Sequence, residues 1–341
     1  MPAARRRPKT TTRKTGSDTL RNSLPGIALV VASVLPSALS PSPASKPGKA
    51  PTPKEFSIPM ANLQDWANSV VVTMEGVQIK GNSKVHALAS DCELHFGAAS
   101  DGFEGDPAGL VLEPMNVCIA PFPGKTEQSN ADWLAFADSI KNTTVTIAGV
   151  PRIWPEHLSG GNETSNPNHA VEIHPLTQVV TTSEKLDFAP NVFAGEFTGG
   201  LGKPTAEKIV QNISVTVAKV DESAEISFRA GTIGNFTVLD LVIDKASIIN
   251  DATGSFRMKG AVVLEDSTNL PVQIVTAVGS PINDEIAKIK KSKRKQVSIQ
   301  GLVLFSLSPQ ALLEAANKSD GSPVDVRQPI QLILYGTPDS E

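Results

Sequence analysis

The segment SNADWLAFADSIKNTTVTIAGV, residues 129–150, decides the fold, because it joins a short helix to a strand within a chain of strand signals. We expect a helix over residues 130–141, capped by Ser129 with Asp132 three positions later. Its apolar residues recur at helical spacing and share one face: Trp133, Ala137 and Ile140. Residues 145–150, VTIAGV, then return to the pattern of a strand.

Strand signals surround this segment on both sides. Apolar or β-branched runs occur at residues 70–74, 110–112 and 115–119, and residues 169–180 make a last strand. Cys92, Leu94 and Phe96 alternate with Asp91, Glu93 and His95, which predicts a half-buried strand. One helix inserted late in a run of strands is typical of a small closed barrel of the OB type. The sequence therefore predicts a mainly β fold, with an OB-like barrel followed by a second β-rich domain.

Part of this first half resembles a family of small exported bacterial domains, OB-like and largely uncharacterised, that end in an "ELHPV"-type strand. The resemblance covers roughly residues 66–182, and the last strand reads EIHPL here. The residues that carry it are Asp91, Glu93, His95, Cys118, Gly149, Glu172, His174 and Pro175. This sequence departs from the family in residues 151–168, where the family tends to have a shorter, Gly-rich connection. The resemblance implies a fold and an export context, and it implies no activity.

The amino terminus has the order of a secretory signal: a basic segment, a short apolar core and then small residues. The core is IALVVASVL, residues 27–35, and cleavage is expected after Ala44. An uncleaved single-pass anchor over about residues 24–40 is the alternative. The sequence thus divides into a signal or anchor (1–45), a Pro-rich linker (46–60), an OB-like barrel (61–185) and a second β-rich domain (186–341). The folded part is expected to be exported, either secreted or periplasmic.

Composition narrows the classes of function. With 40% hydrophobic residues the chain can build cores, so wholesale disorder is excluded. Residues 1–40 hold seven of the 31 basic residues and one of the 35 acidic ones, so the remaining residues carry 24 basic against 34 acidic, a net charge of −10. Because nucleic-acid binding depends on Lys and Arg facing phosphates, no nucleic-acid partner is expected for the body of the protein.

The chain has two cysteines, Cys92 and Cys118. In an oxidising compartment the pair is expected to close one disulfide. The alternative is two buried free thiols that behave as small apolar side chains.

The second half contains neither His nor Cys and carries a further series of strand signals. We expect strands at residues 209–220, 224–230, 236–249, 256–264, 271–278, 296–302 and 330–334, and a helix at 282–291. VSIQGL, residues 297–302, follows that helix as VTIAGV follows the first one. This echo suggests a second OB-like barrel, and the alternative is a coincidence between two ordinary strands.

All five histidines lie in the first half, and they suggest one polar cluster. Side chains alternate along a strand, so acids and histidines two positions apart share a face. The cluster consists of Asp91, Glu93, His95, Glu172 and His174. Such a set suits Zn²⁺ or Mn²⁺, or a general acid and base. The competing interpretation is a row of solvated cross-strand pairs.

Two further segments, a loop and a basic run, each allow a functional and a simpler structural interpretation. The connection 158–168 is rich in turn residues and suggests either a binding loop, with His157, Asn162, Asn166 and His169, or an exposed connection. Lys288, Lys290, Lys291, Lys293, Arg294 and Lys295 form a basic run. This run suits an anionic lipid or polymer, or simply the carbonyl end of a helix.

No zinc-protease H-E-x-x-H motif, G-x-S-x-G elbow, P-loop or dinucleotide fingerprint occurs in the sequence. We therefore expect a non-enzymatic exported protein that binds a ligand or an envelope partner. A metal-dependent hydrolase using the polar cluster is the first alternative, and a purely structural envelope domain is the second. A membrane contact is expected only through the amino-terminal segment, if that segment is uncleaved.

Overall fold

The computed structural model describes residues 52–103, 109–158, 162–188 and 200–337, and for Asn162 and Glu163 the backbone alone. The chain divides into two units, Met1–Lys49 and Ala50–Glu341, and the second is the one described here. The predicted signal or anchor lies outside the described residues. No helix within the described ranges has the length and apolar character needed to cross a membrane.

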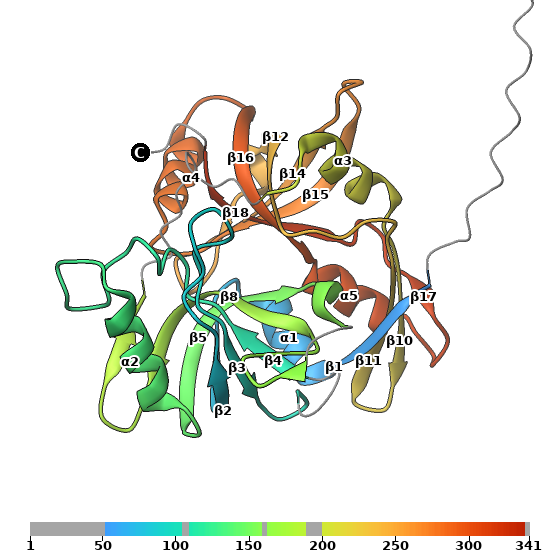
Figure 1. The fold of residues 1–341 in the computed structure, drawn as a ribbon. Coiled ribbons are helices and arrows are strands. Elements are labelled where there is room, and N and C mark those ends of the chain that lie inside the picture. Colours follow the sequence, from blue (N-terminus) through green and yellow to red (C-terminus); the bar gives the residue numbers. More distant parts are fainter. Residues whose placement is uncertain (1–51, 104–108, 159–161, 189–199, 338–341) are drawn as a thin grey trace, which may run out of the picture. The chain divides into compact units, whose positions relative to one another are not determined.

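The first half forms a closed five-stranded barrel of OB topology (Figure 1). Its strands pair in the order β4-β3-β2-β5-β8, and parallel pairing of β4 with β8 closes the barrel. The strands are β2 (Val72–Asn82), β3 (Phe96–Ala99), β4 (Gly109–Leu112), β5 (Thr144–Ile153) and β8 (His169–Val180). Helix α2 (Asn130–Ile140) lies between β4 and β5, and its Ser129 cap accepts a hydrogen bond from the Asp132 amide, as predicted. A short strand β9 (Lys185–Asp187) extends the sheet beside β8.

The second half forms another closed five-stranded barrel with the same order of strands. Here the first strand pairs with the second and the fourth, and the third pairs in parallel with the fifth. The strands are β12 (Phe236–Asp244), β14 (Phe256–Val263), β15 (Asn269–Thr276), β16 (Gln296–Leu307) and β18 (Ile330–Gly336). Helix α4 (Pro281–Lys291) lies between the third and fourth strands, as α2 does in the first barrel. The prediction of a second OB-like barrel is therefore confirmed.

A third sheet, outside both barrels, joins the two halves of the chain. Its strand order is β1-β11-β10-β17, and the amino-terminal β1 pairs antiparallel with β11 from the second half. The strands are β1 (Lys54–Pro59), β10 (Ser214–Val220), β11 (Ser223–Arg229) and β17 (Val324–Asp325). Helix α1 (Met60–Asn68) packs against α5 (Pro309–Ala316), which again links the ends of the chain. In Figure 1, β1 runs beside β11 and β10.

This sheet corrects two predictions. Residues 54–59 belong to a paired strand and not to the linker predicted over 46–60, because Phe56 and Ile58 alternate inward and are buried. Residues 209–212 belong to helix α3 (Lys203–Asn212) and not to a strand, because Ala206 and Ile209 recur at helical spacing and are buried. The two barrels lie within one compact unit, and the predicted boundary at 185/186 falls in β9, at the end of the first barrel.

The predicted strand through Cys92 is also wrong, since β3 begins only at Phe96. Cys92 and Asn116 both have φ of +59°, which interrupts an extended backbone. Cys92 and Cys118 form the expected disulfide, with their Cα atoms 5.1 Å apart. The disulfide ties the loop before β3 to the turn after β4. The remaining short elements are η1 (Pro155–His157), β6 (Asn162–Glu163), β7 (Asn166–Pro167), η2 (Lys245–Ser247) and β13 (Ile249–Asn250).

Candidate functional site

The polar cluster lies inside the molecule, where the first barrel meets the second. Glu172 and His174 come from β8, and their side chains are 1% and 0% exposed. Glu113 follows β4, and Glu93 lies in the loop before β3; both are buried. The second barrel covers the ring of His174 with Phe236 and Tyr335, at ring-centroid distances of 5.6 and 6.1 Å. The Tyr335 hydroxyl donates a hydrogen bond to the His174 carbonyl oxygen at 3.2 Å.

His174 is the centre of the buried group. Its Nε2 lies 2.9 Å from Glu93 Oε1, and its Nδ1 lies 2.5 Å from Glu113 Oε2. Neither ring nitrogen is aligned for a hydrogen bond, so these contacts are ion pairs of short distance and poor direction. Burial lowers the pKa of His174, but Glu93, Tyr335 and Glu113 outweigh it and raise that pKa well above its ordinary value. His174 is therefore held as an imidazolium.

Arg152 closes the inner end of the cluster. Its side chain is 0% exposed, and its guanidinium forms a close ion pair with Glu172. Its Nε donates a hydrogen bond to the Phe305 carbonyl of β16 at 2.9 Å, so this side chain crosses from the first barrel to the second. Burial raises the pKa of Glu172, but Arg152 and the neighbouring histidines outweigh it and hold that pKa well below its ordinary value. His169 Nε2 lies 3.1 Å from the second oxygen of Glu172.

The charges of this cluster balance only if histidines take part. Three buried carboxylates, Glu93, Glu113 and Glu172, face a single guanidinium, Arg152. Two further positive charges are needed, and burying an unpaired charge is costly. Two imidazolium groups supply them at neutral pH. Burial lowers the pKa of His95, but Glu113, Glu93 and Asp91 outweigh it and raise the pKa to about 9.

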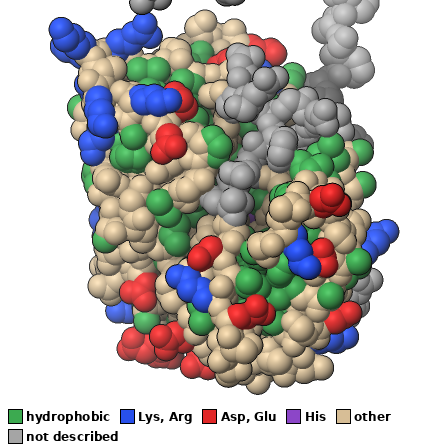
Figure 2. Space-filling model, turned by 90° about the vertical axis from the view of Figure 1, so that its left-hand side faces the viewer, with side chains coloured by type: hydrophobic (Ala, Val, Ile, Leu, Met, Phe, Trp, Pro, Cys, Tyr) green, Lys and Arg blue, Asp and Glu red, His purple; other side chains and the backbone are tan. Residues whose placement is uncertain are grey.

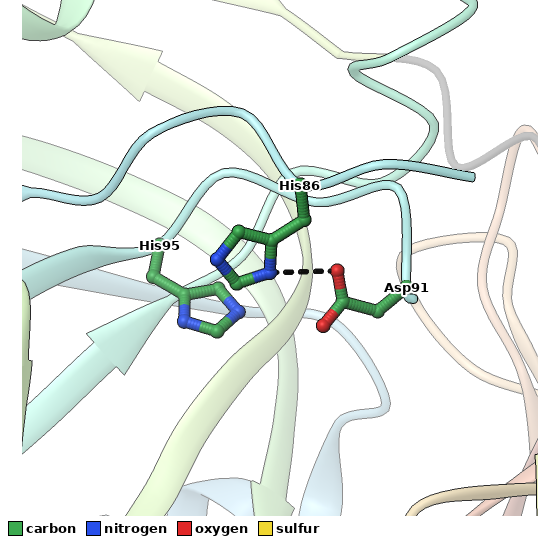
Figure 3. A group of neighbouring side chains, drawn as sticks. All are labelled: His86, Asp91 and His95. Carbon is green, nitrogen blue, oxygen red and sulfur yellow. Dashed lines mark hydrogen bonds and ion pairs between the residues drawn. The ribbon is translucent and has the colours of Figure 1, made fainter. Parts of the chain in front are cut away.

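The outer end of the cluster is a group of three partly exposed side chains, His86, Asp91 and His95, which we call the outer triad (Figure 3). His86 Nδ1 lies 2.7 Å from Asp91 Oδ1, and the rings of the two histidines are 4.4 Å apart edge to face. One ligand atom from each residue lies within 4.8 Å of the others. Figure 3 shows the three side chains converging from the two arms of the loop that joins β2 to β3.

His95 connects the outer triad to the buried group. Its Nε2 lies 3.4 Å from Glu113 Oε1 and 3.6 Å from Glu93 Oε2, while its ring contacts His86 on the outer side. A metal-binding histidine commonly has its second nitrogen directed to a carboxylate, which orients the ring. The side chains of His86 and Asp91 are 22% and 21% exposed, so solvent reaches the outer triad. The arrangement thus fits an ion-binding position with a buried acidic support.

The structure brings together four of the five predicted cluster residues, namely Glu93, His95, Glu172 and His174. Asp91 lies at the solvent side, paired with His86 and beside His95 in the outer triad. The expectation of solvated cross-strand pairs is wrong, because the second barrel buries these side chains. Five residues of the site were not predicted from the sequence, because each stands alone in its segment and is not part of a motif. They are His86, Glu113, Arg152, Phe236 and Tyr335. Of these, only His86 had a signal, since it is a histidine near Asp91.

The described part of the predicted binding loop, residues 162–168, packs on the first barrel. Its β6–β7 hairpin lies against β3, where a Cβ on Gly97 would meet the Thr164 carbonyl oxygen at 1.9 Å. His169 is buried and directed to Glu172, and the ring of His157 stacks on it at 5.1 Å. Asn166 is half-buried, and the side chain of Asn162 lies outside the described residues. The hairpin covers the barrel because small residues on β3 let its backbone approach closely.

Comparisons with known proteins give no relative: no family model, curated protein or solved structure matches this chain. The resemblance to exported OB-like domains therefore remains an expectation from the residues quoted for it.

Proposed function

We propose that this chain is an exported, non-enzymatic double-barrel protein that binds a divalent transition-metal ion, foremost Zn²⁺, at the outer triad of His86, Asp91 and His95. The observation that carries the proposal is the convergence of two imidazoles and one carboxylate within 4.8 Å at a solvent-accessible position. This ligand set suits Zn²⁺ and related ions, whereas Mg²⁺ and Ca²⁺ prefer oxygen ligands alone. Binding requires these three ligand atoms, now within 4.8 Å of one another, to come to about 2.0–2.2 Å from one ion.

The buried carboxylates behind His95 support this position. Glu93 and Glu113 lie within 3.6 Å of its Nε2, so they can fix the ring while the other ring nitrogen gives up its proton to bind the ion, whose charge replaces that of the imidazolium. The disulfide at Cys92 holds the chain beside Asp91 and limits the freedom of the loop. Export is supported by that disulfide, since such bonds persist mainly in oxidising compartments.

The test is metal content and calorimetric titration of the purified full chain. We expect one Zn²⁺ per chain, lost to a chelator and regained on titration. His86→Ala and Asp91→Asn should each weaken binding at least about tenfold. Loss of a residue that merely supports a ligand already costs that much, and these two residues are ligands themselves. His157→Gln is the matched control, since the ring of His157 stacks on His169 and belongs to none of the ligand groups of the described residues. Absence of Zn²⁺ binding by the folded wild-type chain, or equal binding by His86→Ala, would refute the proposal.

A metal-dependent hydrolase is the second candidate, favoured by one observation. Three protein ligands with a partly exposed outer side leave a fourth position for water, as in catalytic zinc sites. Zn²⁺-dependent cleavage of model esters, phosphodiesters or peptides, lost in His86→Ala, would favour this candidate. Stoichiometric Zn²⁺ without such cleavage would favour the non-enzymatic proposal.

A further inference from the structure

A basic surface lies on the second barrel, far in sequence from the outer triad. It comprises the exposed or half-exposed side chains at the end of α4 and the start of β16, together with neighbours from η2 and β14. We call it the basic corner: Lys245, Lys259, Lys290, Lys291, Lys293, Arg294 and Lys295. Figure 2 shows Lys and Arg side chains gathered in the upper left of the view, at the level of α4, with some Asp and Glu side chains beside them and others below.

Backbone contacts hold these segments together. The Lys245 amide donates to the Lys295 carbonyl at 3.1 Å, and the Lys245 ammonium donates to the Ser292 carbonyl. The Lys259 amide donates to Ser247 Oγ at 2.8 Å, which fixes β14 against η2. The cations therefore occupy one continuous surface, although they come from three parts of the sequence.

The positive charge of the basic corner is largely uncompensated. Lys288, next to it on α4, is paired with Glu285 at 2.5 Å and is left out for that reason. Lys291, Lys293, Arg294 and Lys295 have no ion pair with any acidic side chain of the described residues. Lys290 lies over the Phe256 ring at 5.7 Å, and Asp244 is engaged in capping η2. Such a positive surface, on a protein whose residues after the amino-terminal segment carry net negative charge, attracts anionic partners.

An exposed apolar side chain adjoins these cations. Ile249 is 62% exposed, the largest value among large apolar side chains of the described ranges. It lies two residues after η2 and pairs across the sheet with Arg257 of β14. Exposed apolar and basic side chains together are the mark of a surface that meets an anionic bilayer, whereas a soluble polyanion needs the cations alone. The described corner offers no exposed aromatic side chain on which nucleic-acid bases could stack.

We propose that the basic corner docks this protein onto a membrane surface rich in anionic phospholipid, with Ile249 entering the headgroup region. This function is independent of the outer triad. Each Lys or Arg near such a surface contributes roughly fivefold to partitioning, so four of them together should give a large and salt-sensitive effect.

The test is co-sedimentation of residues 50–341 with vesicles, since this unit contains every strand of both barrels and omits the amino-terminal bases. Vesicles of phosphatidylcholine with phosphatidylglycerol are compared with pure phosphatidylcholine. The test variant changes four cations of the corner to glutamine: Lys291→Gln, Lys293→Gln, Arg294→Gln and Lys295→Gln. The matched control changes four exposed lysines of the first barrel: Lys80→Gln, Lys125→Gln, Lys141→Gln and Lys185→Gln.

We expect binding to the anionic vesicles only, at least about tenfold weaker in the corner variant and unchanged in the control. Ile249→Ser should weaken vesicle binding while leaving thermal stability unchanged, because its side chain is exposed. Equal binding by the corner variant and the wild type would overturn the proposal. Binding to soluble polyphosphate without binding to anionic vesicles would assign the corner to a soluble polyanion instead. Vesicle binding that is unchanged in Ile249→Ser would overturn the entry of Ile249 into the headgroup region.

Discussion

Replacing Arg152 by methionine tests whether the buried charges hold the two barrels together. Methionine keeps most of the length and packing of the side chain and removes the guanidinium. Glu172 then loses its strongest partner at a site that is 1% exposed, and the Phe305 carbonyl loses the Nε donor at 2.9 Å. Removing one member of a buried ion pair costs about 3–5 kcal/mol, because the other charge stays buried and uncompensated. We expect the free energy of unfolding to fall by that amount.

The second variant in this test is Arg152→Met combined with Glu172→Gln. With both charges removed, Glu93 and Glu113 remain opposite the imidazolium groups of His95 and His174, so the cluster is again neutral. The double variant should therefore recover at least half of the stability lost by Arg152→Met alone. Urea unfolding, followed by circular dichroism and by Trp fluorescence, measures all four members of the cycle. Trp154 is a suitable reporter, because its ring stacks on Phe305 at 5.6 Å.

A loss below about 1 kcal/mol for Arg152→Met would refute this reasoning, since it would mean that water compensates Glu172. A double variant as unstable as the sum of the two single variants would refute it as well. In that case the residues would act through packing, and their charges would not be coupled.

Three further predictions concern the same region. Replacing both Cys92 and Cys118 by alanine should lower the free energy of unfolding by about 3.5 kcal/mol on the chain-entropy relation, since the cysteines are 26 residues apart; chemical denaturation with and without reductant measures this. The free energy of unfolding should depend on pH at both the acid and the alkaline end of the range. The pKa of Glu172 is lowered, so its contribution to folding stability is present above pH 4.5, the ordinary value, and is lost as the pH falls through its folded pKa. The pKa of His174 is raised, so its contribution to folding stability is complete below pH 6.5, the ordinary value, and is lost as the pH rises through its folded pKa. Melting temperatures across pH should therefore be flatter at the acid end in Glu172→Gln and at the alkaline end in His174→Gln. Gly97→Ala should destabilise by more than about 1 kcal/mol, because the new Cβ meets the Thr164 backbone, and thermal melting will show it.

The barrels could be predicted because their signals are local. The helix over 130–140 has a cap at Ser129 and one apolar face, and both depend on residues no more than seven positions apart. The echo between residues 145–150 and 297–302 proved informative because both segments are fourth strands, β5 and β16, each following the helix of its barrel. Strand β1 escaped prediction, because its partner β11 lies about 170 residues further along the chain, with Lys54 opposite Phe228.

The cluster could be predicted only in part, for the same reason. Alternation along β8 correctly placed Glu172 and His174 on one face, but it could not show what covers that face. The covering residues, Phe236 and Tyr335, lie more than 60 positions away and belong to another barrel. Glu113 stands alone after a buried strand, and only the three-dimensional fold brings its carboxylate to His174. Burial was thus the property that the sequence could not reveal.

Burial also indicates what the inner cluster does for the fold. A buried ionic network adds little net stability over an apolar interface, because desolvation offsets the attraction between its charges. It does penalise any packing of the barrels that leaves a charge unpaired. Arg152 reaches Phe305 of β16, and Tyr335 of β18 reaches the His174 carbonyl, so these contacts select one register between the barrels. The same selection fixes Glu93 and Glu113 behind His95, and thereby orients the inner side of the outer triad. The second barrel, which contributes no residue to the outer triad, is in this way required for its geometry.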